Sequence, residues 1–172
     1  MDERELALIS STLTIRSATA AEHEAVARLW TTLLDARSTY HASHAPSDDS
    51  VEAHVAQIEH WVGEGTAIVQ VAIDASETIV GACVGRITPR PASLAEERIG
   101  RIEMIVVEPN HRDAGIGRTM LRAAVEDFRR AGVGRLEANI CAENSDAIRF
   151  FERSRFELHT VTLSRDLGPP QS

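Results

Sequence analysis

The hydrophobic positions of this chain repeat with the period of a helix in some stretches and with that of a strand in others. Two early stretches show the helical period. The first follows Thr19, whose spacing from Glu22 is that of a capping box, and the second covers residues 50–62 and ends at Gly63. We therefore predict two successive helices, with apolar faces formed by Val26, Leu29, Trp30, Leu33 and Leu34 in the first and by Val51, Val55, Ile58 and Val62 in the second.

Shorter β-prone runs predict the strands. They cover residues 13–16, 67–73, 79–87 and 136–141, and the connection at 74–78 is short enough for a hairpin. Residues 156–167 form a last extended segment. Ahead of it, Asn144 is placed to cap a short helix over residues 146–154.

Residues 99–131 combine both patterns, and the rest of the chain is arranged around them. A β-prone run at 104–107 is closed by Pro109, and apolar residues then recur at helical spacing from Ile116 to Phe128. The whole chain thus reads β-α-α-β-β-β-α-β-α-β, an α/β fold with a mixed central sheet. Because crossover connections are right-handed, we expect strands four and five to be parallel neighbours.

Composition and charge narrow the function classes. The chain has 172 residues, enough for one domain, and its formal net charge of −8 disfavours nucleic acid as a partner. A charged N-terminus, and no apolar run near the length of about 18 residues that a span needs, predict a cytoplasmic protein without a membrane partner. Cys83 and Cys141 lie in apolar runs, so we expect buried free thiols and no metal site.

The turn before the third predicted helix carries the strongest signal for a ligand. Gly115 and Gly117 allow the backbone to curl tightly and to bring several N–H groups of a helix N-terminus close to an anion. Phosphate is the expected guest, and Arg112 adds a bidentate cation. The residues expected to contact it, through main-chain or side-chain groups, are Arg112, Asp113, Ala114, Gly115, Ile116, Gly117, Arg118 and Thr119.

Three phosphate-binding patterns compete at this turn. A P-loop requires a lysine after its second glycine, where this chain has Arg118, and a dinucleotide fingerprint requires a third glycine, where it has Met120. The pattern R/Q-x-x-G-x-G/A matches at Arg112, Gly115 and Gly117. An ordinary turn, in which the glycines merely permit left-handed geometry, is the alternative without a ligand.

This pattern, after an apolar strand closed by proline, resembles the signature with which the GNAT superfamily of N-acetyltransferases cradles the pyrophosphate of acetyl-CoA. A second stretch resembles the other GNAT hallmark, N-x-x-A-x-x-F-Y-x-x-x-G-F, and matches it at Asn144, Ala147, Phe150 and Phe156. The predicted element order also agrees with the GNAT fold over nearly the whole chain. The resemblance implies an acetyltransferase domain at 12–167 with strands four and five splayed apart, a flexible extension at 1–11 and a tail at 168–172.

The resemblance also implies roles for residues outside the turn. The backbone of Val106 and Val107 would pair with the pantetheine arm, while Asn144 and Phe151 would border the cofactor. Glu103 stands where similar enzymes often carry a catalytic glutamate. The acceptor would be a small-molecule amine or an amine of a peptide or protein, walled by Tyr40, His41 and His44. Dimers are common among similar proteins, so a homodimer is among the expected assemblies.

Two positions depart from the second hallmark. Phe151 stands where the family often has a tyrosine whose hydroxyl assists the departing thiolate, so that assistance would come from water or Ser145. Arg155 replaces a glycine, which predicts a turn without left-handed geometry. For Phe150 we expect packing in the core.

Two interpretations of Glu103 stay open. Strand alternation places Glu103, Ile105 and Val107 on one face, where partial burial would raise the pKa of the carboxyl group and suit it to act as a base. Alternatively, Glu103 is a salt-bridged residue paired with Arg101 or Arg86.

Three function hypotheses follow. The first is an acetyl-CoA-dependent N-acetyltransferase in which a primary amine attacks directly in a ternary complex. The second, suggested by Phe151, is a catalytically weak or inactive acyl-CoA-binding sensor or scaffold. The third, a nucleotide-binding module, is disfavoured by the missing lysine and third glycine.

Overall fold

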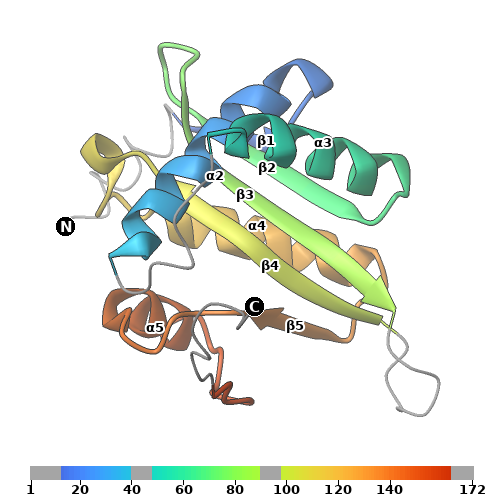
Figure 1. The fold of residues 1–172 in the computed structure, drawn as a ribbon, viewed down its shortest axis with the longest axis vertical. Helices are drawn as coiled ribbons and strands as arrows, with labels where there is room; N and C mark the ends of the chain where they lie inside the picture. The colour runs from blue at the N-terminus through green and yellow to red at the C-terminus, as the bar shows by residue number, and fades with distance from the viewer. Residues whose placement is uncertain (1–12, 40–47, 90–97, 164–172) are drawn as a thin grey trace, which may run out of the picture.

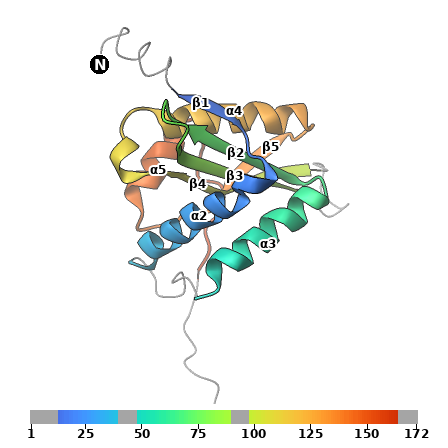
Figure 2. The same cartoon turned by 90° about the horizontal axis from the view of Figure 1, so that it is seen from above.

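A sheet of five strands carries helices on both of its faces (Figure 1). Helices α2 (His23–Ser38) and α3 (Ser50–Gly63) cover one face, and α4 (Ile116–Arg130) covers the other (Figure 2). This layered arrangement confirms the predicted α/β fold with a mixed central sheet.

The structure is a computed structural model that describes residues 13–39, 48–89 and 98–163. The predicted extension at 1–11, the predicted tail at 168–172 and the acceptor-site candidates Tyr40, His41 and His44 lie outside these residues. Within the described ranges, no helix has the length and apolar character needed to cross a membrane.

The order of the strands in the sheet follows their order in the chain. The strands are β1 (Thr14–Ser17), β2 (Ala67–Ile73), β3 (Ile79–Pro89), β4 (Arg98–Val107) and β5 (Arg135–Ala138). The first four pair antiparallel, whereas β5 runs parallel to β4. The parallel pair, joined through α4, confirms the expected relation between strands four and five.

Each face of the sheet carries its own apolar core. The α2–α3 side buries Ile58 and Trp61, and the α4 side buries Met120 and Phe128. Phe128 lies so close to the sheet that a Cβ at Gly85 would stand 2.5 Å from its ring. The absence of a side chain at Gly85 therefore lets α4 approach β3 closely.

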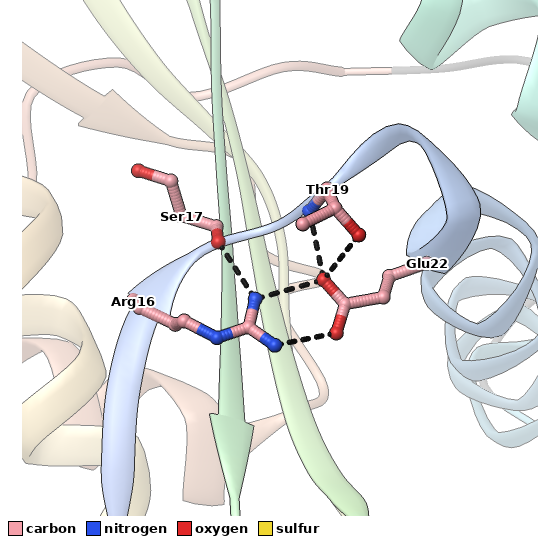
Figure 3. Close-up of polar contacts among 4 residues, drawn as sticks. All are labelled: Arg16, Ser17, Thr19 and Glu22. Carbon is pink, nitrogen blue, oxygen red and sulfur yellow. Dashed lines mark hydrogen bonds and ion pairs between the residues drawn. The ribbon is translucent and has the colours of Figure 1, made fainter.

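A compact polar cluster holds the entry to the first helix (Figure 3). The Glu22 carboxylate accepts hydrogen bonds from the Thr19 N–H at 2.7 Å and from both terminal nitrogens of Arg16 at 2.8 and 2.7 Å. The predicted capping box is present, and it begins a 3-10 turn, η1 (Ala20–Glu22), that runs into α2.

This cluster makes the start of the helix sensitive to acid. The hydrogen bonds from Arg16, with help from the Thr19 N–H, lower the pKa of Glu22 from 4.5 to about 2. Because the pKa is lower in the folded state, the stabilising contribution is present above pH 4.5 and is lost as the pH falls toward 2.

Several predicted segments differ from the structure. β5 ends at Ala138 instead of residue 141, which leaves the half-buried Cys141 outside the strand, with its thiol donating to a Glu143 carboxylate oxygen at 2.7 Å. Residues 156–163, the described part of the predicted last extended segment, form no strand. Their large apolar side chains are exposed, so little packing holds them against the sheet; these are Leu158, Val161 and Leu163. α3 includes Gly63, and the residue with left-handed geometry after it is Gly65.

Two further helix details differ from the predictions. On α3 the position facing the core near the helix end is Trp61, whereas Val62 is exposed. The helix predicted at 146–154 is α5 (Ser145–Glu152). For α3 the helical period is correct, but packing against the core decides which side of the helix is buried. For α5 the helix is correctly predicted, and its first and last residues differ by one and two positions.

Candidate functional site

The turn between β4 and α4 leaves a run of main-chain amides unpaired at a helix N-terminus. A 3-10 turn, η3 (Pro109–His111), follows β4, and the backbone is left-handed at Asp113 (φ 62°) and at Gly115 (φ 77°). No described residue accepts a hydrogen bond from the amides of residues 113–118. Such donors, at the positive end of a helix dipole, fit an anion such as a diphosphate.

The two glycines of the pattern have different reasons to be glycine. Gly115 carries the positive φ, whereas Gly117 lies inside the first turn of α4. A Cβ on Gly117 would stand 3.4 Å from the ring of Phe150 and 3.7 Å from a methyl carbon of Val107. The prediction that both glycines curl the turn is therefore wrong for Gly117, which instead packs against these two side chains.

Three side chains expected to bind phosphate at this turn, those of Arg112, Arg118 and Thr119, differ in whether they have hydrogen-bond donors available for a ligand. Arg112 is exposed, and its Nε donates to the Val107 carbonyl at 3.1 Å, which ties the guanidinium to the end of β4. Arg118 is exposed in the first turn of α4. Thr119 donates from its N–H and from its hydroxyl to the Gly115 carbonyl, both at 3.1 Å, so neither donor is left for a phosphate.

Thr119 also faces a different region of the molecule. It lines a cavity of about 430 Å³ together with Gln70 and Arg122, between α4 and the β1–β2 edge of the sheet. This cavity does not include the unpaired amides. The structure therefore brings together residues 112–118, while the Thr119 side chain contacts the Gly115 carbonyl and borders the separate cavity.

The two parallel strands part beside this turn. Pairing between β4 and β5 runs from Ile99↔Arg135 to Ile102↔Ala138, and no described residue of β5 pairs with β4 beyond that point. Val106 and Val107 thus have β3 as their strand neighbour and no partner on β5. This geometry agrees with the predicted splay and leaves space for an extended ligand beside β4.

The second motif lies against the turn through α5. Asn144 caps this helix, as predicted, and its Oδ1 accepts a hydrogen bond from the Ala147 N–H at 3.0 Å. Phe151 is buried in the α4-side core, and Phe150 is half-buried beside Gly117. Phe150 packs against the margin of this core, as expected, and Phe151 lies within it.

The end of α5 corrects the prediction for Arg155. This residue is left-handed (φ 66°), and its N–H donates to the Glu152 carbonyl at 2.9 Å, while the Phe156 N–H donates to the Phe151 carbonyl at 3.1 Å. The rings of Phe151 and Phe156 meet at 5.0 Å between centroids. These contacts form a complete Schellman motif, which imposes left-handed geometry even on an arginine.

Glu103 occupies a β-bulge in β4. Val84 pairs with Met104 and Gly85 pairs with Ile102, which leaves Glu103 without a partner on β3. Consequently Ile102 packs in the α4-side core, whereas Met104 packs in the α2–α3 core. In an uninterrupted strand Ile102 and Met104, two positions apart, would lie on the same face. The bulge places them on opposite faces.

The bulge also places the Glu103 carboxylate on the α2–α3 side. Glu103 lies 3.8 Å from the Nε of Arg86, whose guanidinium carbon is 5.0 Å from the ring centroid of Trp61 on α3. The prediction that Glu103 shares a face with Ile105 and Val107 is therefore wrong, since those two pack toward α4.

Both interpretations of Glu103 describe part of its environment. Burial raises its pKa above 4.5, and the positive charges of Arg101 and Arg86 oppose that effect. A half-buried carboxyl group with a raised pKa is suited to accept a proton near neutral pH. The ion pair to Arg86 is present as well.

Two residues that contact Arg86 and Arg101 were not identified from the sequence. Trp61 stacks on Arg86, and Glu137 on β5 lies 3.5 Å from Arg101. Finding them requires the β3–β4 and β4–β5 registers, which a hydropathy pattern does not contain. The available signal is two arginines, Arg86 and Arg101, each three residues from the β3–β4 connection and so opposite each other in the hairpin.

The buried thiol has no place in this chemistry. Burial, with a contribution from Asp127, raises the pKa of Cys83 to about 12, so it stays protonated at neutral pH. Within the described ranges, no three His, Cys, Asp or Glu side chains are grouped so that they could hold a metal.

Fold and site together define a class of protein. It is an α/β domain in which a diphosphate-sized row of amides at a helix N-terminus stands beside two diverging parallel strands. The chain belongs to the acetyltransferase (GNAT) family, whose model matches residues 26–156.

Comparison with individual proteins agrees with this family. Over 74 residues the chain is 26% identical to mycothiol acetyltransferase from Geodermatophilus obscurus, a match that covers 43% of this chain and 24% of that protein. The chain therefore spans about a quarter of the length of this curated relative.

Solved structures share the fold. A tetramutant of the BH1408 protein from Bacillus halodurans has a TM-score of 0.78 at 23% identity, covering 90% of this chain and 99% of that one. The acetyltransferase AAC(6')-Iy, solved with the bisubstrate analogue CoA-S-monomethyl-acetylneamine, has a TM-score of 0.68 at 19% identity, covering 90% and 97%.

Proposed function

We propose that this chain is an N-acetyltransferase that transfers the acetyl group of acetyl-CoA to a primary amine by direct attack in a ternary complex. The observation that carries the proposal is the row of unpaired amides at residues 113–118, next to the point where β4 and β5 part. Membership of the acetyltransferase family supports it.

The cofactor lies across these two features. Its diphosphate accepts hydrogen bonds from the amides of residues 113–118, with Arg112 and Arg118 adding positive charge. Its pantetheine arm follows β4 beside Val106 and Val107. The Asn144 carboxamide, which caps α5 through its oxygen, and the rings of Phe150 and Phe151 border the arm.

Glu103 serves as the base. An amine acceptor is mostly protonated at neutral pH, and its neutral form is the nucleophile. The amine nitrogen bonds to the thioester carbon, the C–S bond breaks with its electron pair on sulfur, and Glu103 takes the proton that the nitrogen loses. The thiolate then takes a proton from water or from Ser145, because Phe151 has no hydroxyl to donate. Cys83 is fully buried and thus out of reach of the thioester, which argues against an acyl-enzyme on this residue.

The acceptor site lies on the α2–α3 side of β4. Glu103 faces that side, and the segment that holds Tyr40, His41 and His44 connects α2 to α3. The acceptor is an amine of a small molecule or of a peptide or protein, and the protein works alone or as a homodimer.

Measurement of acetyl-CoA binding and of CoA release with a panel of amines tests this proposal. We expect acetyl-CoA to bind, to stabilise the protein against heat, and to yield free CoA that depends on an amine. ATP and NAD should produce no comparable stabilisation. Tight acetyl-CoA binding without turnover on any amine would instead support the sensor hypothesis.

A further inference from the structure

A row of charged residues crosses three strands next to Glu103. Arg86 on β3 pairs with Arg101 on β4, which pairs in turn with Glu137 on β5. Arg86 lies over Trp61, so the row belongs to the face covered by α3. Two arginines directly opposite each other repel, and each has one carboxylate beside it, Glu103 for Arg86 and Glu137 for Arg101.

Neither arginine has its hydrogen-bonding capacity filled. A guanidinium offers five N–H donors, yet no described residue accepts a hydrogen bond from the guanidinium of Arg86 or Arg101, and the Nε of each is buried without a partner. The nearest carboxylates, Glu103 at 3.8 Å and Glu137 at 3.5 Å, are ion-pair contacts longer than hydrogen bonds.

The arginine heads are nevertheless reachable and well positioned. Their side chains are 30% and 33% exposed, so the terminal nitrogens can meet a solute. The ring of Trp61 supports the Arg86 guanidinium at 5.0 Å, which restricts its motion before any ligand arrives. A supported guanidinium is suited to bidentate binding of a carboxylate or phosphate.

We infer that the acceptor amine carries an anionic group, a carboxylate or a phosphate, which Arg86 and Arg101 hold while its nitrogen reaches Glu103. This inference rests on the proposed acetyltransferase function and names its substrate class. Arg101 and Glu103 are two strand positions apart, which separates their Cα atoms by roughly 7 Å. The anion and the amine are therefore separated by a few bonds, as in an amino acid or an aminoalkyl phosphate.

The test uses two matched pairs of acceptors at saturating acetyl-CoA. One pair is alanine and alaninamide, and the other is phosphoethanolamine and ethanolamine, so that the two arms separate carboxylate from phosphate. The quantity measured is the ratio of kcat/KM for the anionic member to kcat/KM for the neutral member. Comparing this ratio between wild type and variants cancels the intrinsic reactivity of each amine.

The variants are Arg86→Gln and Arg101→Gln, with Arg129→Gln as the matched control, because Arg129 is an exposed α4 arginine paired with Glu126. We expect at least one pair to favour its anionic member in the wild type. That ratio should fall about tenfold to a hundredfold in each site variant and stay unchanged in Arg129→Gln. Arg86→Lys keeps the positive charge but loses the planar guanidinium that can form two parallel hydrogen bonds, so it should show an intermediate ratio.

The possible failures are distinguishable. If acetyl-CoA does not bind, the proposed function itself fails. If acetyl-CoA binds and the neutral amines are acetylated with an unchanged ratio in Arg86→Gln and Arg101→Gln, the inference fails and the proposed function stands. A protein that binds acetyl-CoA and acetylates neither anionic amine also overturns the inference. Circular dichroism of each variant, and the Arg101→Gln result, guard against a folding defect at Arg86.

Discussion

The cofactor side and the acceptor side of the candidate site are built from different parts of the chain. On the cofactor side, the groups that we propose bind acetyl-CoA are main-chain amides of residues 113–118, and their positions follow from a short local turn. On the acceptor side, side chains from three strands and a helix meet at a bulge. Substitutions on the acceptor side should therefore change turnover and selectivity, whereas those on the cofactor side should change affinity for acetyl-CoA.

The largest effect is expected from Glu103→Gln. Removing a general base lowers kcat by about 10²–10⁴-fold, while the Kd of acetyl-CoA should stay unchanged because Glu103 lies outside the turn. Steady-state kinetics and calorimetric titration measure the two quantities. Glu126→Gln, which changes an exposed carboxylate on α4, is the control and should retain the activity. Wild-type turnover in Glu103→Gln would remove this residue from the mechanism.

The pH profile sharpens this prediction. The active form of Glu103 is the carboxylate, and burial raises its pKa above 4.5. The wild-type rate should therefore fall as the pH drops through this raised pKa, at a higher pH than for an exposed glutamate. If the rate of the Glu103→Gln enzyme falls over the same acidic pH range as the wild-type rate, a group other than Glu103 titrates there.

A smaller effect is expected from Arg112→Ala on the cofactor side. The substitution removes a charged donor and the contact with the Val107 carbonyl, so the Kd of acetyl-CoA should rise about tenfold to a hundredfold. Arg112→Lys should recover part of this loss through its charge. Calorimetric titration gives the Kd, and an unchanged value would place the diphosphate elsewhere.

The two glycines of the turn should respond in opposite directions to alanine. Gly115→Ala forces a side chain into left-handed geometry and should lower the free energy of unfolding by about 1 kcal/mol. Gly117→Ala lies within a helix, with its nearest neighbour at 3.4 Å. It should leave this free energy unchanged or raise it by up to about 1 kcal/mol. Urea unfolding measures both, and equal losses would contradict the different reasons given for the two glycines.

The smallest effect is expected from Arg155→Gly, outside both halves of the site. Glycine removes the cost of left-handed geometry, about 1–2 kcal/mol, against a larger entropy loss on folding of about 0.5–1 kcal/mol. The free energy of unfolding should rise by about 0.5–1 kcal/mol. Arg153→Gly, at a right-handed position in the same turn, should lower it. Destabilisation by Arg155→Gly would contradict the Schellman geometry.

The same contrast explains how far the sequence could predict the molecule. The glycine at 115 and the cap at Asn144 act on their immediate neighbours, so short patterns predicted the turn, the parallel pair and the α5 start. The register of two strands decides where Glu103 points, and the bulge that reverses its face has no local signature. The left-handed geometry of Arg155 comes from the local Schellman motif, which the replacement of glycine by arginine concealed from the sequence pattern.

The most direct test of the account is a crystal structure of the protein with coenzyme A. We predict that the diphosphate oxygens lie within hydrogen-bonding distance of amides between residues 113 and 118, with the pantetheine arm running along β4 toward Glu103. A diphosphate bound elsewhere, for example in the cavity lined by Gln70 and Arg122, would contradict the assignment of the turn and the mechanism built on it.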